Sequence, residues 1–546
     1  MIIFAKDHGV IPGGWVAREL NQLFASLAQA QEPVTVVIDP GTYHLDAKDC
    51  PKKTLRITNT VGAVDPEGAL PPHVIPVGLC LENLNRVTLL GKGARFVMHG
   101  KLTNAAVLHC RDLVIDGIAI THDNPDFHEF SVVDKTAHTV DYRLDAQSRY
   151  EKRADGNFDY VGYGYRSPIL AAPAGWDCAH MYRDGAEAHY IRTHQPFRFA
   201  TDITELEDHL FRVSYPDTEA FNVGEHYGVY NCKRRYNGIF IDGSSNVTLR
   251  GIAQHFNFAL AVVAQDSENI SVCGCTFAPE KGSVLKTASC ADFIQMCMCK
   301  GQMTVTDNYF CGAGDDVINV HGVHFLIEQI EKNRLVLVFP HNETCGFLPI
   351  HTGDRIEYVD PETLLCVGEA NVMQAELTDE RHITVLVDST AGARAQFAVE
   401  DATMCPDLYF ARNTMTRIVT RGMLITTRGK VVVEDNLFSD VTDDHILISD
   451  DAGKWYESGC VRDVTIRRNC FDRCGAYYIE ICPENRKHGG AVHSNIAITD
   501  NLFTEYRGIF AKSTENLTLR GNIHPAKQEE YLQLHDVSGL DTDADL

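Results

Sequence analysis

Two adjacent aspartates, Asp315 and Asp316, stand in the stretch GAGDDVINVHG, residues 312–322. The apolar segment that follows them alternates like a β-strand, so both carboxylates fall where the chain enters a strand. Like charges this close raise one another's pKa, which favours one protonated carboxyl beside an ionised one. This combination can cleave a glycosidic bond, because one group protonates the leaving oxygen while another deprotonates an attacking water.

Short segments that could position these acids recur along the chain with one pattern. Each opens with a polar residue, alternates polar and apolar residues, and often closes on Asn-x-Phe. Phe310 follows Phe277 by 33 residues, and Phe471 follows Phe438 by 33 residues. Such periods with strand alternation predict a β-solenoid rather than helical repeats. The segments are NVTLRGI (246–252), NISVCGCTF (269–277), QMTVTDNYF (302–310), KVVVEDNLF (430–438), DVTIRRNCF (463–471), NIAITDNLF (495–503) and NLTLRGNIH (516–524).

The repeats indicate an all-β fold, a parallel β-helix in which each coil stacks on the one before it. The recurring phenylalanines predict a stacked apolar core, and the recurring asparagines predict an amide ladder at the adjacent turn. Because both recur in successive coils, we expect them to be structural. The two sets are Phe277, Phe310, Phe438, Phe471 and Phe503, and Asn308, Asn436, Asn469 and Asn501.

An amphipathic stretch and two irregular regions interrupt this rhythm. Residues 15–31 present apolar side chains at helical spacing, which predicts an N-terminal capping helix for the solenoid. The two irregular regions contain strand-like segments of their own, which suggests small inserted β-barrels or sandwiches. The expected divisions are 1–124, N-terminal cap and first coils; 125–235, an inserted β-rich domain; 236–322, coils with the aspartates; 323–407, an inserted small β-barrel; and 408–546, C-terminal coils.

A third aspartate is expected beside the first two. Asp292 precedes Asp315 by 23 residues, the same offset as that between Asn246 and Asn269. Residues one coil apart stack at about 4.8 Å, so this spacing predicts that Asp292 lies beneath the pair. We assign Asp315 as general acid and the other two as the groups that activate water, which predicts inversion at the anomeric carbon.

Two other interpretations of the three acids stay open. Three carboxylates can form a cage for a hard cation such as calcium. The Gly-Asp-Asp segment could also be a solvated turn without chemistry. The predicted stacking of Asp292 favours catalysis over both, and the sequence therefore predicts neither a metal nor a cofactor.

Further candidate substrate-binding residues follow the aspartates. In the segment 445–459 an aromatic ring stands among acids, a combination that stacks on a sugar face and accepts hydrogen bonds from its hydroxyls. A tryptophan packed in the core and a structural histidine are the alternatives. The candidates are Asn319, His321, Asp451, Trp455, Glu457, Glu480 and Glu484.

Composition narrows the partners. The formal net charge of −25 disfavours nucleic acid and anionic membranes. The apolar runs are of strand length, and the N-terminus lacks the pattern of a secretion signal. The 18 cysteines are scattered and lack a zinc spacing, so we expect reduced, buried thiols and a cytoplasmic protein. A homo-oligomer stays possible.

Several motifs resemble those of glycoside hydrolase family 110. They are GAGDDVINVHG (312–322), RGMLITTRGKVVVEDN (421–436), SDDAGKWYESGCVRDVTIRRN (449–469) and ICPEN (481–485). The resemblance implies a right-handed β-helix with inserted β-barrels and an exo-acting, inverting α-1,3-galactosidase. It further implies a catalytic trio at Asp292, Asp315 and Asp316, no required metal, and a galactose-terminated oligosaccharide or glycan as partner.

Three competing functions remain. A polygalacturonase-like hydrolase also uses aspartates on a β-helix, but a basic groove would suit its uronate substrate, and the clusters at 450–457 and 480–484 are acidic. A polysaccharide lyase would need calcium and a basic residue as catalytic base. A carbohydrate-binding or structural β-helix would retain the acids without chemistry.

Overall fold

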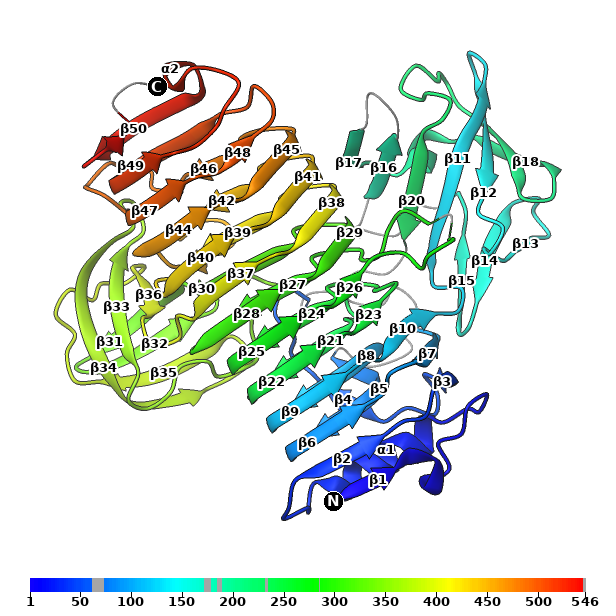
Figure 1. The fold of residues 1–546 in the computed structure, drawn as a ribbon, viewed down its shortest axis with the longest axis horizontal. Coiled ribbons are helices and arrows are strands. Elements are labelled where there is room, and N and C mark those ends of the chain that lie inside the picture. The colour runs from blue at the N-terminus through cyan, green and yellow to red at the C-terminus, as the bar shows by residue number, and fades with distance from the viewer. Residues whose placement is uncertain (61–72, 171–177, 184–188, 231–233, 284, 544–546) are drawn as a thin grey trace.

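The chain folds into a right-handed parallel β-helix that carries two inserted β-structures (Figure 1). The computed structural model describes residues 1–60, 73–170, 178–183, 189–230, 234–283 and 285–543. Sheet pairing is parallel from coil to coil along the solenoid, as the repeat pattern predicts. No helix in the described part of the chain is long and apolar enough to span a membrane.

Each coil contributes strands to three faces. The first face carries the candidate acids, and its strands run β5 (Val74–Glu82), β8 (Thr103–Leu108), β21 (Ile239–Asp242), β24 (Val262–Gln265), β27 (Ile294–Cys297), β30 (Ile318–Val323), β39 (Met423–Thr426), β42 (Ile446–Ile448), β46 (Ile479–Ile481) and β49 (Ile509–Arg520). The second face includes β6 (Asn85–Leu90), β9 (Arg111–Asp116), β22 (Ser245–Arg250), β25 (Glu268–Cys273), β28 (Gln302–Thr306), β37 (Asp407–Ala411), β40 (Lys430–Glu434), β44 (Asp463–Arg467) and β47 (His493–Thr499). The third face is a separate sheet of β3 (Gly41–Asp46), β7 (Ala94–His99), β10 (Ala119–His122), β23 (Ala253–Gln254), β26 (Thr276–Phe277), β29 (Tyr309–Ala313), β38 (Thr414–Ile418), β41 (Leu437–Val441), β45 (Cys470–Cys474) and β48 (Leu502–Phe503).

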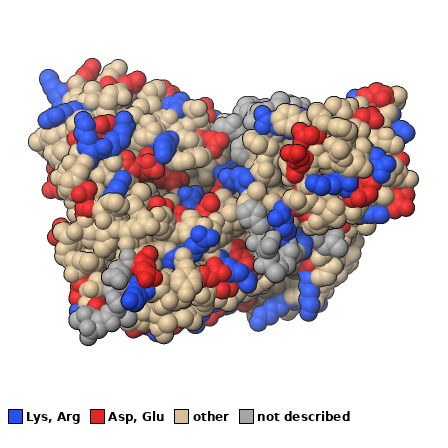
Figure 2. All heavy atoms as spheres, turned by 90° about the horizontal axis from the view of Figure 1, so that it is seen from above, with Lys and Arg blue, Asp and Glu red and all other residues tan. Residues whose placement is uncertain are grey.

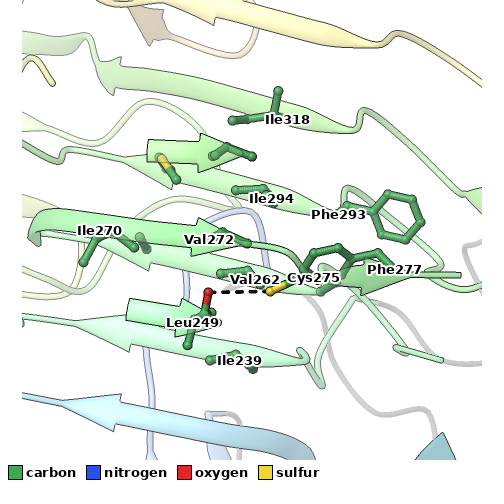
Figure 3. Packing of buried hydrophobic residues seen from close by; sticks show 14 of the residues in the cluster. Ile239, Leu249, Val262, Ile270, Val272, Cys275, Phe277, Phe293, Ile294 and Ile318 are labelled. Atoms are coloured by element: carbon green, nitrogen blue, oxygen red, sulfur yellow. Dashed lines mark hydrogen bonds between the residues drawn. The ribbon is translucent and has the colours of Figure 1, made fainter. Parts of the chain in front are cut away.

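The interior is a column of stacked apolar side chains (Figure 3). The rings of Phe277 and Phe310 stack with their centroids 5.2 Å apart, and those of Phe438 and Phe471 stack at 4.8 Å. The predicted phenylalanine column is therefore confirmed. Burial of each such ring removes a large apolar surface from water and is the main source of stability in a solenoid core.

The predicted amide ladder is confirmed at the turn beside the phenylalanine column. The buried Asn436 donates from Nδ2 to Oδ1 of Asn469 at 2.9 Å and accepts at Oδ1 from the backbone N–H of Asn413 at 2.8 Å. Each rung thus satisfies buried polar groups of its neighbours. The ladder continues in one register through Asn308, Asn413, Asn436, Asn469, Asn501 and Asn522.

The cap and the two insertions lie within the predicted ranges. Helix α1 (Ala17–Leu27) buries Leu20, Leu23 and Phe24 against the first coils. The first insertion is a seven-stranded antiparallel sheet with a three-stranded sheet beside it, and the second is a closed six-stranded barrel. The first comprises β11 (Phe127–Lys135), β12 (Thr139–Leu144), β13 (Tyr150–Lys152), β14 (Phe158–Gly162), β15 (Tyr165–Pro168), β16 (Ala179–Arg183), β17 (His189–Thr193), β18 (Asp202–Glu207), β19 (Leu210–Ser214) and β20 (His226–Tyr230). The barrel comprises β31 (Phe325–Glu331), β32 (Arg334–Val338), β33 (Arg355–Asp360), β34 (Leu365–Leu377), β35 (His382–Val387) and β36 (Ala398–Asp401).

Cysteines in the described residues are free thiols, and most of them are buried; Cys366 is exposed. The prediction of buried, reduced thiols therefore holds for this part of the chain.

Candidate active site

Asp292 and Asp316 occupy equivalent positions in neighbouring coils. Strands β27 and β30 pair with Ile294 opposite Ile318, an offset of 24 residues, and the backbone N–H of Phe293 donates to the carbonyl of Asp316 at 3.0 Å. The offset of 23 that placed Asp292 beneath Asp315 is therefore wrong by one residue. In register, the stacked pair is Asp292 and Asp316, about 4.8 Å apart along the coil axis, and Asp315 lies beside it.

The next coil answers Asp316 with a cation. Arg421 follows Asp316 in the same column, because Ile318 pairs with Met423. Its Nε and Nη2 donate to the two carboxylate oxygens of Asp316 at 2.9 and 3.0 Å, a bidentate ion pair. The hydroxyl of Thr420 donates to Asp316 at 3.1 Å and lies 3.3 Å from Asp315.

Asp315 is held by two arginines that come from outside its own coil. Nη2 of Arg192, on β17 of the inserted sheet, lies 2.6 Å from Oδ2 of Asp315 and 2.6 Å from the carbonyl oxygen of Gly314. The buried Arg234 also pairs with Oδ2 of Asp315, and its Nη1 donates to Asn59 at 3.2 Å. The inserted sheet therefore completes the electrostatic environment of the solenoid acids.

These contacts split the pKa values of the three acids. Burial, and then the charges of Asp315 and Asp316, raise the pKa of Asp292 well above its usual range. Burial also raises the pKa of Asp316, although Arg421 opposes it. Burial acts the same way on Asp315, but Arg192 and Arg234 outweigh it and lower its pKa. The unliganded site therefore keeps its proton on the stacked pair and not on Asp315, which conflicts with the sequence assignment of Asp315 as proton donor.

The three acids line one pocket of about 80 Å³. Asn319, Trp455 and Glu457 line it as well, as the sequence analysis proposed. The remaining lining residues are Asn59, Arg234, Arg421 and Leu424.

The loop that carries Trp455 and Glu457 is fixed to the strand that follows the aspartates. Strand β43 (Glu457–Ser458) pairs antiparallel with β30, with Glu457 opposite Val323. Nδ2 of Asn319 donates to Oε1 of Glu457 at 3.2 Å. Trp455 is 51% exposed, with its ring centroid 4.6 Å from that of His341 in the barrel insertion, so the alternative of a core tryptophan is wrong.

Asp451 and Glu484 lie outside the pocket. The buried Asp451 accepts hydrogen bonds from the backbone N–H groups of Gly453, Lys454 and Trp455, so it shapes the loop rather than contacting a ligand. Glu484 pairs with the side chain of Lys454 at 3.1 Å on the surface. Their predicted role in direct substrate binding is therefore not supported, because each carboxylate already has its partners in the loop.

Glu480 and His321 also lie outside the pocket lining. Glu480 shares the column of Asn319 but stands three coils further on, and burial together with Asp444 raises its pKa to about 7. His321 lies behind the pocket, with Nε2 3.7 Å from Glu457. Burial lowers the pKa of His321, but Glu457 and Cys297 outweigh it and raise this pKa to about 10.

The charge on His321 constrains its other neighbour. Nε2 of the Gln295 amide lies 3.0 Å from Nε2 of His321. Because an imidazolium accepts no hydrogen bond, a charged His321 requires this amide to turn its oxygen toward the ring. His321 then orients Glu457 from behind, which is a positioning role.

The sequence analysis missed the arginines and Asn59. Arg421 stands in the motif RGMLITTRGK, but its column became visible only once the register across the barrel insertion was known. Arg192 and Arg234 belong to a region without coil periodicity, so no spacing rule connected them with Asp315.

The arginines also bear on the calcium interpretation. Oxygens of Asp315 and Asp316 are engaged by guanidinium groups, which would repel a divalent cation placed between them. Within the described residues, no group of three or more His, Cys, Asp or Glu side chains has an arrangement that could hold a metal ion.

Comparison with known proteins identifies relatives along the whole chain. No family model matches it. An α-1,3-galactosidase A of Bacteroides thetaiotaomicron is 31% identical over 561 residues, covering 98% of this chain and 95% of that protein. An α-1,3-galactosidase A of Bacteroides fragilis is 30% identical over 536 residues, covering 95% and 86%. Among solved structures, a Yersinia enterocolitica family 28 exopolygalacturonase gives a TM-score of 0.43 at 11% identity, covering 100% of this chain and 78% of that one.

Proposed function

Because the chain belongs to glycoside hydrolase family 110, the family of α-1,3-galactosidases, we propose that it is an exo-acting, inverting hydrolase. Its proposed substrate is a terminal α-1,3-linked galactose on an oligosaccharide or glycan. The observation that carries the proposal is the group of three buried carboxyls around one pocket, with their pKa values shifted in opposite directions.

The reaction needs one protonated and one ionised carboxyl at the same time. The protonated group gives its proton to the glycosidic oxygen as the bond from that oxygen to the anomeric carbon breaks. The ionised group takes a proton from the water that attacks the same carbon from the opposite face. Since water enters opposite the leaving group, α-linked galactose leaves as β-galactose.

The resting charges restrict which aspartate can give the proton. In the unliganded site the stacked pair Asp292 and Asp316 shares the proton, and Asp315 is ionised. Asp315 can act as donor only if substrate binding draws Arg192 and Arg234 away from its carboxylate. Otherwise Asp292 is the donor and Asp315 stays an anion that stabilises positive charge developing at the anomeric carbon.

Leaving-group chemistry separates these two assignments. An aryl α-galactoside with a strongly acidic phenol as leaving group needs no protonation, so a variant that lacks the donor keeps turning it over. If the resting charges persist in the complex, Asp292→Asn keeps activity on the activated aryl galactoside and loses it on a galactobiose, whereas Asp315→Asn loses both. The reverse pattern assigns the donor to Asp315.

The pocket disfavours uronates, the substrates of the polygalacturonase-like alternative. A uronate carboxylate needs a cation, but Arg192, Arg234 and Arg421 are already paired with Asp315 and Asp316. Figure 2 shows acidic and basic side chains interspersed across the face that it presents, which is not the basic groove that a polyanion requires.

The direct test is a panel of terminal α- and β-linked galactosides and oligogalacturonides. Hydrolysis confined to α-1,3-linked galactosides, with β-galactose as the first product in proton NMR, is the expected result. Release of galacturonate, or of α-galactose as the first anomer, would contradict the proposal.

A further inference from the structure

A second, larger cleft opens on the third face of the solenoid. It holds about 750 Å³ and shares no lining residue with the pocket of the three aspartates. Its floor is the outer side of β3, β7 and β10, and its walls are residues 145–149 of the first insertion and the loop at 280–285. We name it the histidine cleft, after His44, His99, His122 and His255, which line it.

The histidine cleft is electrically balanced although the chain is strongly acidic. Its three acidic residues are matched by three basic ones, Arg95, Arg149 and Lys281. Two of these charges are already paired across the cleft, Arg95 with Glu280 at 2.9 Å and Arg149 with Asp123 at 3.2 Å. An ionic ligand would find no excess of charge here, so a neutral ligand fits best.

Buried polar atoms nevertheless await a partner in this cleft. Oδ1 of Asp145, a residue only 9% exposed, has no hydrogen-bond partner among the described residues. Nδ1 of His122 is likewise unsatisfied within that part of the chain, while its Nε2 bonds Oδ1 of Asn104 at 2.8 Å. Buried polar atoms normally make hydrogen bonds, so these two favour a ligand that carries donors and acceptors.

Aromatic rings flank the cleft at one end. The ring of Trp15, which is 50% exposed, lies with its centroid 4.6 Å from that of His99, and the ring of Tyr163 lies 4.7 Å from His99. An exposed indole beside hydrogen-bonding side chains matches a sugar ring, which has an apolar face and a rim of hydroxyls.

We propose that the histidine cleft is a second, non-catalytic binding site for a neutral oligosaccharide. The cleft lies apart from the aspartates, so it would hold the body of a branched or polymeric glycan while a chain end enters the catalytic pocket. Holding the glycan twice raises the effective concentration of its chain ends without changing the chemistry.

Filling the cleft tests the proposal. Thr121 points outward from β10 between Val97 and His255, and all three line the cleft, so Thr121→Trp should block its floor. The probe is a linear tetrasaccharide that ends in α-1,3-linked galactose, titrated calorimetrically into the Asp315→Asn protein to prevent turnover. Two sites per chain are expected, and one site after Thr121→Trp is added.

A kinetic experiment on the active enzyme extends the test. With the cleft filled, KM for a glycopolymer bearing the same chain end should rise about tenfold, while KM for a galactobiose stays unchanged. Leu502→Trp, an exposed position on β48 of the same sheet but outside the cleft, is the matched control and should change neither. Trp15→Ala, at an exposed position, provides a second route if Thr121→Trp does not fold.

The outcomes separate this proposal from the proposed reaction. If the enzyme does not hydrolyse galactosides, calorimetry still reports whether Thr121→Trp or Trp15→Ala removes a glycan site. A stoichiometry that neither variant changes, or KM changes that are equal for polymer and galactobiose, would overturn the second site.

Discussion

Two columns of side chains run along the same solenoid and differ in what they repeat. At one turn every coil presents an asparagine, and Asn413, Asn436 and Asn469 bond one another in sequence. At the turn that leads into the first face, successive coils present different residues. In register this second column is Leu260, Asp292, Asp316, Arg421 and Asp444.

The difference shows how a repeat fold separates stability from chemistry. A side chain that bonds its own copy above and below satisfies itself, so repetition is stable without any special partner. A buried acid above another acid repels it and needs a cation, which Arg421 supplies to Asp316 from the next coil. The variable column therefore marks the site, and the repeated column marks the scaffold.

Substitution at Asp315 should give the largest effect on activity and little effect on folding. Asp315→Asn removes a charge required in the transition state, and kcat/KM for a galactobiose should fall by about 10³-fold or more. Its thermal midpoint should stay close to that of the wild type, because one like charge is removed from the trio. Asp307→Asn is the control, since the exposed Asp307 also pairs with an arginine, Arg412, outside the pocket. Undiminished turnover of Asp315→Asn would remove this residue from the mechanism.

The sequence predicted the repeated column better than the variable one. Both ladders followed from equal spacings of Phe and Asn, which recur because each coil makes the same contacts. The stacking of Asp292 was off by one residue, because the coil between Asp292 and Asp316 is one residue longer than the coil used as a ruler.

The charged partners were beyond the reach of periodicity. The barrel insertion separates Asp316 from Arg421 by 105 residues, although the two occupy consecutive coils. Arg192 reaches Asp315 from an inserted antiparallel sheet whose strands follow no coil spacing. Local pattern therefore predicted the scaffold and the acids, whereas tertiary contacts decided how those acids are charged.

Arg421→Met would sharpen the comparison by breaking the ion pair within the variable column. Arg421 lowers the pKa of Asp316, so its removal should raise that pKa. If the stacked pair carries the catalytic proton, activity is lost when that proton leaves, and the alkaline limb of kcat/KM should move to higher pH. We expect a loss of about 10²-fold in kcat/KM at neutral pH as well.

The pH profile has a contrary outcome and a control. Movement of the acidic limb alone would show that the stacked pair works as the ionised base, which would return the proton to Asp315. Arg412→Met breaks the exposed pair with Asp307 and should leave both limbs in place.

Asn436→Ala should damage the scaffold and spare the chemistry. The substitution leaves the backbone N–H of Asn413 and the carbonyl oxygen of Phe410 without their buried partner, at a cost of about 1–3 kcal/mol in the free energy of unfolding. Denaturant unfolding should detect this loss, and kcat/KM of the folded protein should stay unchanged. Leu437→Ala, at the exposed neighbouring position, should cost much less. A loss of activity without a loss of stability would make the asparagine column part of the site.

Trp455→Ala should have the smallest effect, because the indole contributes contact area and carries no charge used by the reaction. Its half-exposed ring borders the pocket beside His341, so stacking on a sugar face is worth about 0.5–1.5 kcal/mol, or roughly a 2- to 12-fold rise in KM. Trp455→Phe should recover most of the loss, since a phenyl ring still presents an apolar face. If Trp455→Ala instead lowered kcat as much as Asp315→Asn does, the loop would be holding Glu457 in place for the aspartates. The variable column would then extend, through the pairing of β43 with β30, into the loop that covers it.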